Sequence, residues 1–100
     1  MGKVDIVLYS WLSASFPGRT LNQVVLTESF QGGETLRDLF NRLSTLYPTF
    51  GKLIFNGQTQ RFYSHVNFIY KGEAADAIRD LDRTLEDGDE IVFVPSYAGG

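Results

Sequence analysis

Residues 35–48 read TLRDLFNRLSTLYP, and the spacing of their apolar side chains predicts a helix. Leucine and aromatic residues recur at the i, i+3, i+4, i+7 intervals of a single helical face. They are Leu36, Leu39, Phe40, Leu43, Leu46 and Tyr47. Thr35 followed three residues later by Asp38 is typical of an N-terminal capping box, and Pro48 marks the other end. We therefore expect a helix over residues 35–47.

Runs of strand-forming residues precede this helix. Residues 3–12 are rich in valine, isoleucine, leucine and aromatic residues that alternate loosely, and residues 23–30 (QVVLTESF) form a second such run. Between them lies a segment containing Pro17-Gly18, a pair that favours turns and loops. Together the two runs predict an opening hairpin with a long loop.

Further strand signals follow the helix. In residues 52–64 (KLIFNGQTQRFYS) the favoured turn pair Asn56-Gly57 predicts a small hairpin or ordered loop. Residues 65–72 (HVNFIYKG) predict a strand, and residues 73–85 a mixed stretch or short helical turn. Residues 86–89 (EDGD) predict a tight turn before a last strand at 91–94, which Pro95 ends because it cannot donate a ladder hydrogen bond.

The resulting order, β-β-α-β-(β)-β, predicts an α+β fold of the β-grasp, ubiquitin-like type. A mixed sheet packed on one main helix is the economical way to bury the helix's apolar stripe. The last strand is apolar on both faces, so we expect it to be central in the sheet. The predicted division is a β-grasp domain over residues 1–95 and a flexible C-terminal tail over residues 96–100 that ends in Gly-Gly.

Composition excludes several function classes. The chain has 100 residues, 43% of them apolar and 21% charged, which is typical of a single soluble domain. It has no cysteine, so it offers neither a thiol nucleophile nor a thiolate metal site. A net charge of -3 argues against nucleic acid and favours a basic protein partner or simple solubility. Without a signal-peptide or membrane-span pattern, we expect a cytoplasmic location and no membrane partner.

Side-chain catalysis and cofactor binding find little support. His65 is the only histidine, and neighbouring Ser64 would point to the opposite face of a strand, so the two cannot form a catalytic pair. Gly32-Gly33 lacks the residues of a phosphate-binding loop. Several acidic residues near the last strand lack calcium-loop spacing and are expected to form a solvated turn, with solubility or docking as alternative roles. The residues of the predicted turn are Glu86, Asp87, Asp89 and Glu90, and together with Asp80 and Asp82 just upstream they form the acidic patch to which these alternative roles apply.

The C-terminal carboxylate of Gly100 is then the candidate reactive group. Gly99 and Gly100 have no side chains, so the walls of a partner's active site could approach the backbone closely. Tyr97 lies beyond the last strand, and we expect it to be exposed and to anchor a partner. A carboxylate is a poor electrophile that adenylation would activate, and we expect a partner, rather than this chain, to bind the ATP.

These features resemble the MoaD/ThiS-like ubiquitin-fold sulfur carriers, the family of the molybdopterin synthase small subunit and the thiamine sulfur carrier. The resemblance covers essentially the whole chain and rests on the β-grasp order, HVNFIYKG, LDRTLEDGDEIVFVP (residues 81–95) and the closing Gly-Gly. The longer segment at 52–64 favours the molybdopterin branch. The chain departs from the family's usual pattern at Ser96, Tyr97 and Lys71-Gly72, which leaves the partner's identity open.

The resemblance implies that an E1-like enzyme adenylates Gly100 and that a persulfide donor converts it to a thiocarboxylate. The sulfur would then pass to a biosynthetic partner, such as the large subunit of molybdopterin synthase. The chain would be the sulfur-carrying subunit of a sulfurtransferase, not catalytic alone and binding no cofactor itself. Residues implied in partner binding are Phe93, Pro95, Ser96, Tyr97, Ala98 and Gly99.

Three alternatives remain open. The chain could be a ubiquitin-like protein modifier whose activated Gly100 is attacked by a lysine amine. It could supply sulfur for thiamine or cysteine synthesis instead of molybdopterin. It could also be a non-catalytic interaction domain whose Gly-Gly end has no chemical role.

Overall fold

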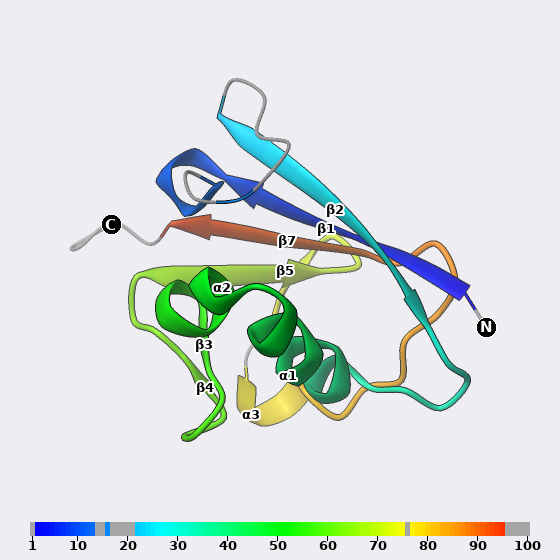
Figure 1. Cartoon of the computed structure of the whole chain (residues 1–100). Coiled ribbons are helices and arrows are strands. Elements are labelled where there is room, and N and C mark those ends of the chain that lie inside the picture. The colour runs from blue at the N-terminus through cyan, green and yellow to red at the C-terminus, as the bar shows by residue number, and fades with distance from the viewer. Residues whose placement is uncertain (1, 14–15, 17–21, 76, 96–100) are drawn as a thin grey trace.

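The predicted helix and its flanking strands all form in the structure, a computed structural model that describes residues 2–13, 16, 22–75 and 77–95. In chain order the elements are β1 (Gly2–Tyr9), the 3-10 helix η1 (Ser10–Ser13), β2 (Gln23–Phe30), α1 (Leu36–Leu46), α2 (Pro48–Leu53), β3 (Phe55–Asn56), β4 (Arg61–Phe62), β5 (Val66–Tyr70), β6 (Glu73–Ala75), α3 (Ala77–Asp80) and β7 (Glu90–Pro95). Figure 1 shows α1 and α2 together on one side of the main sheet.

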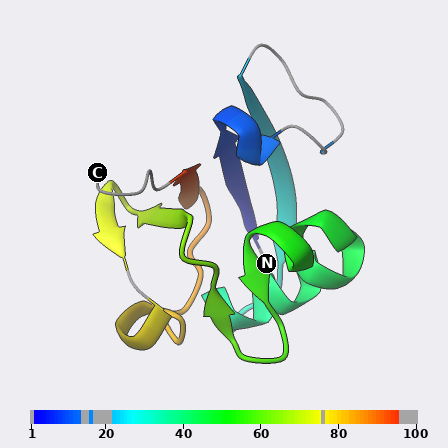
Figure 2. The ribbon, with the colours of Figure 1, turned by 90° about the vertical axis from the view of Figure 1, so that its left-hand side faces the viewer.

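The main sheet has the strand order β2-β1-β7-β5-β6, so β7 is central as predicted. β1 and β7 are parallel, whereas β1–β2, β5–β7 and β5–β6 are antiparallel. A mixed sheet that embraces a helix in this way is the predicted β-grasp. A separate two-stranded sheet pairs β3 with β4, on the helix side of the molecule (Figure 2).

Helix α1 begins and ends almost where its sequence predicts. Thr35 is the N-cap: its hydroxyl accepts the Asp38 N–H at 3.2 Å, and its own N–H donates to Asp38 Oδ2 at 3.0 Å. Tyr47 is the C-cap. Leu46 corrects the predicted apolar face, because it lies at the rim of the stripe and is 55% exposed.

Helix α2 was not predicted. Pro48 ends α1 and also occupies the first position of α2, where its missing N–H costs nothing. Phe50 is the fully buried residue of this short helix. A six-residue helix has too few turns to show a reliable period, so the sequence gives no clear signal for it.

The core is dominated by aromatic rings that the helices and the sheet bring together. Phe40 on α1 lies at the centre, with ring centroids 5.5–6.0 Å from those of five other phenylalanines. They are Phe50, Phe55, Phe62, Phe68 and Phe93. Helix α1 therefore buries its stripe against both sheets at once.

Two local predictions were wrong in detail. Residues 10–12 continue as η1 instead of β1, and Ser10 has a φ of 58° that breaks the strand. The predicted small hairpin forms as β3 and β4, but Asn56-Gly57 is not a two-residue turn between them. Asn56 pairs with Arg61, so four residues connect the strands, and the Asn56 side chain accepts the N–H groups of Gln58 and Thr59.

Candidate functional site

The candidate site is the end of β7, from which residues 96–100 continue. Pro95 is buried and stands in register with Val66 of β5, so the ladder runs one residue further than the predicted end. The predicted tail residues Ser96, Tyr97, Ala98, Gly99 and Gly100 lie outside the described residues.

Phe93 corrects the site prediction. The resemblance implied that it belongs to a docking surface, but the residue is 0% exposed and its ring packs 5.6 Å from both Phe40 and Phe50. Alternation along the strand places it on the helix side of the sheet. Its side chain therefore holds β7 to the core and is not part of an exposed surface.

Two aromatic side chains fix the chain that leads into β5, next to the end of β7. His65 Nε2 lies 2.6 Å from the Leu53 carbonyl oxygen, and the Tyr63 hydroxyl donates to the Gly51 carbonyl at 2.9 Å. The two rings are stacked with centroids 5.7 Å apart. Because a carbonyl only accepts, this nitrogen of His65 carries a proton, and the geometry favours a structural role for His65 over a catalytic one.

The opposite end of β7 is held by a buried carboxylate. Asp89 is 6% exposed and accepts hydrogen bonds from the Tyr70 hydroxyl at 2.6 Å, the Glu86 N–H at 2.9 Å and the Lys71 ammonium at 3.0 Å. The predicted solvated turn is therefore wrong for Asp89, and Asp80 of the predicted acidic patch is also buried, at 3% exposed.

Burial and hydrogen bonding have opposite effects on the pKa of Asp89. Burial works to raise its pKa, but the hydrogen bonds from Tyr70, Glu86 and Lys71 outweigh burial, so the pKa of Asp89 lies below its ordinary value. Burial and the neighbouring carboxylate raise the pKa of Tyr70. Both groups therefore stay in one protonation state at neutral pH, as expected of a structural pair.

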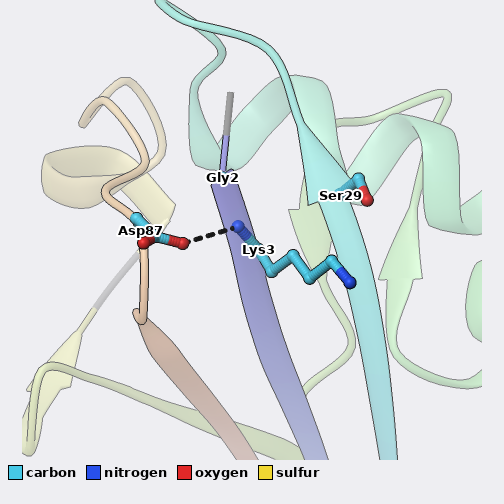
Figure 3. A pocket seen from close by; sticks show the side chains of 4 residues that line it. All are labelled: Gly2, Lys3, Ser29 and Asp87. Atoms are coloured by element: carbon cyan, nitrogen blue, oxygen red, sulfur yellow. Dashed lines mark hydrogen bonds between the residues drawn. The ribbon is translucent and has the colours of Figure 1, made fainter.

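A depression of about 480 Å³ lies at the start of β1, away from the end of β7, and is lined by Gly2, Lys3, Ser29 and Asp87 (Figure 3). The Lys3 N–H donates to Asp87 Oδ1 at 2.9 Å, while the Lys3 side chain points toward β2. One ammonium and one hydroxyl beside a carboxylate make a poor anion site and offer no activated nucleophile. This depression is not the candidate site.

Metal and membrane sites receive no support within the described ranges. No group of three or more histidine, cysteine or acidic side chains there is placed to hold a metal ion. None of the helices in those ranges is long and apolar enough to cross a bilayer.

A family model and several solved structures match this chain. The ThiS family model matches residues 16–100. SAMP1 (small archaeal modifier protein 1) of Haloferax volcanii has a TM-score of 0.74 at 25% identity, covering 99% of this chain and 100% of that chain. A search of curated protein sequences gives no match.

Two more distant structures share the fold. Urm1 of Trypanosoma brucei has a TM-score of 0.70 at 19% identity, covering 99% of this chain and 96% of that one. A Pyrococcus furiosus protein described as molybdopterin converting factor, subunit 1, has a TM-score of 0.66 at 18% identity, covering 97% of this chain and 100% of that one.

Proposed function

Because this chain belongs to the ThiS family of ubiquitin-fold sulfur carriers, we propose that the carboxylate of Gly100 is its reactive group. An E1-like enzyme adenylates this carboxylate, which is then converted to a thiocarboxylate. The sulfur goes to cofactor biosynthesis, with this chain acting as the small subunit of molybdopterin synthase. The chain is a carrier, and its partner enzymes perform the chemistry.

The family match, which extends to residue 100, is the observation that carries this proposal. The geometry of β7 supports it, because the central strand, paired on both sides, ends at Pro95, five residues before Gly100. Five fully extended residues span at most about 18 Å. A partner must therefore place its reactive atoms within that distance of the end of β7.

The proposed chemistry has three steps. A carboxylate oxygen of Gly100 attacks the α-phosphorus of ATP, and pyrophosphate leaves. A persulfide sulfur then attacks the acyl carbon and AMP leaves, which forms an acyl disulfide. A thiol cleaves the S–S bond, which releases the thiocarboxylate and leaves a disulfide on the donor. ATP and both sulfur groups come from the partners.

The molybdopterin assignment is the finer part of the proposal. It is supported by the sequence of residues 52–64, which resembles the longer molybdopterin-type carriers and forms the β3–β4 sheet. In this branch the acceptor is the large subunit of molybdopterin synthase, into whose pocket the tail enters. Thiamine or cysteine synthesis would require the same chemistry at Gly100 with a different acceptor.

A modifier function is the second candidate, and the likeness to SAMP1, described as a modifier protein, favours it. In that case a lysine amine attacks the activated Gly100 and an isopeptide bond forms. The fold and the activation step are the same in both cases, so only the fate of the activated carboxylate distinguishes them.

The test is the intact mass of the protein after incubation with an E1-like enzyme, ATP and a persulfide donor. We expect the wild-type chain to exchange one oxygen for one sulfur and the Gly100-deleted chain to remain unchanged. Gly100→Ala should lose most of the transfer. Gly32→Ala is the matched control, because a Cβ at Gly32 meets nothing within 4 Å and transfer should be normal.

A normal transfer rate in Gly100→Ala would argue against the carrier function. Conjugates of higher mass in a cell lysate that disappear on deletion of Gly100 would support the modifier. If the chain is never adenylated, the interaction domain without a reactive tail is the better description.

A further inference from the structure

The chain contains three lysines, and activation of Gly100 makes each of them a candidate acceptor of its acyl group. They are Lys3, Lys52 and Lys71. A primary amine attacks an activated acyl carbon only when the amine is unprotonated and is held close to that carbon. The structure separates the three lysines on both counts.

Lys71 is held by two carboxylates. Its ammonium donates to Asp89 Oδ1 at 3.0 Å and lies 3.2 Å from Glu86 Oε2. The hydrogen bond to Asp89, followed by that to Glu86, raises the pKa of Lys71 above its ordinary value. The amine is therefore protonated at neutral pH and is a poor nucleophile.

Lys3 lies far from the reactive end. The Gly88 N–H donates to the Lys3 carbonyl at 2.8 Å, so Lys3 lies level with the turn before β7. Gly88 precedes Pro95 by seven residues, which corresponds to about 23 Å along a strand. Five residues beyond Pro95 span at most about 18 Å when fully extended, and about 12 Å on average as a coil. Gly100 therefore meets Lys3 rarely.

Lys52 lies on the same side of the molecule as the end of β7. It is in the last turn of α2, and His65 Nε2 lies 2.6 Å from the carbonyl oxygen of the neighbouring Leu53. The residue after His65 is Val66, which is in register with Pro95. Figure 1 shows α2 on the side toward which β7 runs, whereas β1 starts on the opposite side.

The side chain of Lys52 is also open to reaction. The residue is exposed, and its ammonium forms no ion pair with any residue that the structure describes. Lys52 thus combines exposure, a side chain that no described carboxylate holds and a position near the end of β7.

We propose that Lys52 is the site at which the activated carrier acylates itself and closes a ring with Gly100. Nζ of Lys52 attacks the acyl carbon of the Gly100 adenylate, a C–N bond forms, the C–O bond to AMP breaks, and the amine proton goes to solvent. The product is an isopeptide within one chain, lighter than the free chain by one water. This inference rests on the proposed function, which supplies the activated group.

Ring closure competes with sulfur transfer. Both reactions consume the same acyl adenylate, so closure increases when the persulfide donor is scarce. Two groups joined by a short link meet at an effective concentration on the order of millimolar, so attack within one chain exceeds attack by a second copy in dilute solution. The closed chain has no free carboxylate at Gly100, so self-acylation withdraws carrier from use.

The first test does not depend on the activating enzyme. The full chain is prepared as a C-terminal thioester by intein cleavage and incubated in dilute, mildly alkaline solution. Intact mass separates the ring from the hydrolysed chain, which is heavier by one water, and from dimers. We expect the wild-type chain to form the ring, with a proteolytic peptide that joins Lys52 to Gly100. The product should resist hydroxylamine, which cleaves thioesters and esters but not amides.

Three lysine variants locate the acceptor. Lys52→Arg keeps the charge and removes the nucleophile, and we expect it to lower the yield of the ring about tenfold or more, because no other amine has the same proximity. Lys3→Arg and Lys71→Arg are the matched controls and should form the ring as the wild-type chain does. Thermal unfolding of each variant checks that the fold is retained.

The second test uses the E1-like enzyme and ATP. When the persulfide donor is omitted, we expect the ring to accumulate in the wild-type chain but not in Lys52→Arg. Addition of the donor should replace the ring with the thiocarboxylate, and Lys52→Arg should form the thiocarboxylate as readily as the wild-type chain.

The outcomes separate this inference from the proposed function. If the thioester only hydrolyses, or if Lys52→Arg closes as readily as its controls, the inference is wrong, and the carrier function stands as long as the enzyme forms the thiocarboxylate. If the thioester closes on Lys52 but no enzyme adenylates the chain, the proposed function is wrong, and the inference falls with it because nothing activates Gly100. Dimers joined through Lys52 in place of the ring would assign the reaction to two copies and overturn the proposal.

Discussion

Asp89 connects the turn before β7 to the core. Its carboxylate accepts hydrogen bonds from the side chains of Tyr70 and Lys71 at the end of β5 and from the Glu86 N–H in the turn itself. Tyr70 also stacks beneath the Arg83 guanidinium, 4.7 Å from its ring centroid. The turn includes Gly88, whose φ of 86° favours glycine. The cluster therefore fixes where the central strand begins.

The first prediction concerns Asp89→Asn. We expect the free energy of unfolding at neutral pH to fall by about 2 kcal/mol, because the variant loses charge-assisted hydrogen bonds in a buried position. The pKa of Asp89 is lower in the folded protein than its ordinary value of 3.8. Its stabilisation is therefore complete above that value and is lost as the pH falls through the folded-state pKa.

Urea unfolding at a series of pH values measures this effect. The wild-type chain and Asp89→Asn should converge in stability in strong acid and differ by a constant amount from pH 5 upward. Asp87→Asn is the control, because Asp87 is exposed and an asparagine oxygen can still accept the Lys3 N–H. Parallel pH profiles of wild-type and Asp89→Asn would contradict the assigned role.

At the scale of elements, α1 is anchored at its N-terminus by its own cap and by a distant loop. The N–H groups of Leu36 and Arg37 donate to the carbonyls of Arg83 and Leu81 at 3.0 and 2.8 Å, and the Leu85 N–H donates to the Glu34 carbonyl at 2.8 Å. The first helical N–H groups have no partner within a helix, so these bonds satisfy donors that would otherwise be unpaired. The loop thus joins α1 to β7.

The edge strands β2 and β6 are each contacted by an arginine. Arg42 of α1 donates to the Ser29 carbonyl at 2.7 Å, and Arg79 of α3 donates to the Ala74 carbonyl at 3.2 Å. Unpaired groups on edge strands invite pairing with another chain. Both helices therefore help to protect the sheet as well as to cover its core.

The second prediction is that Thr35→Ala lowers the free energy of unfolding by about 1 kcal/mol. The substitution removes the hydroxyl that accepts the Asp38 N–H and so breaks one half of the capping box. Urea denaturation followed by circular dichroism measures the change.

Thr45→Ala on the same helix is the matched control. Thr45 is exposed and its hydroxyl donates to the Asn41 carbonyl, so it caps nothing, and alanine has the higher helix propensity. We expect Thr45→Ala to be neutral or slightly stabilising. Equal losses in both variants would show that the cap of α1 contributes nothing specific.

For the molecule as a whole, Phe40 links the two sheets and the helices α1 and α2. The third prediction is that Phe40→Ala lowers the free energy of unfolding by about 3–5 kcal/mol, because it leaves a cavity among five other rings. The total free energy of unfolding of a domain of this size is about 5–15 kcal/mol, so the variant should be only marginally folded.

Phe62→Ala is the comparison. Phe62 also packs on Phe40, with centroids 5.5 Å apart, but it is half-buried and lies on the short β4. The remaining structure can close around a gap at the surface more easily, so we expect a loss of about 1–2 kcal/mol. A loss in Phe62→Ala as large as that in Phe40→Ala, measured by urea unfolding, would show that the β3–β4 sheet is as central as α1.

The sequence by itself determined the main helix, the strands of the main sheet around it and the family. The signals for the main helix are local: the spacing of Leu36, Leu39, Phe40 and Leu43, the capping box and Pro48. Such signals act through interactions between residues close in sequence, so they can be recognised without the tertiary structure. The double-sided apolar character of residues 91–94 also correctly predicted a central strand. The reactive role of Gly100 remains a prediction.

Only the tertiary structure decided which side chains of those elements face the core and which face solvent. Alternation along a strand gives two sets of residues but does not say which set meets the helix, and both sets in β7 are apolar. Phe93 was therefore placed on the surface and proved buried, and Asp89 was placed in solvent and proved buried beside Tyr70. The strand order of the main sheet likewise depends on pairing between strands that are far apart in sequence, and pairing of distant segments is fixed by the packing of the whole molecule.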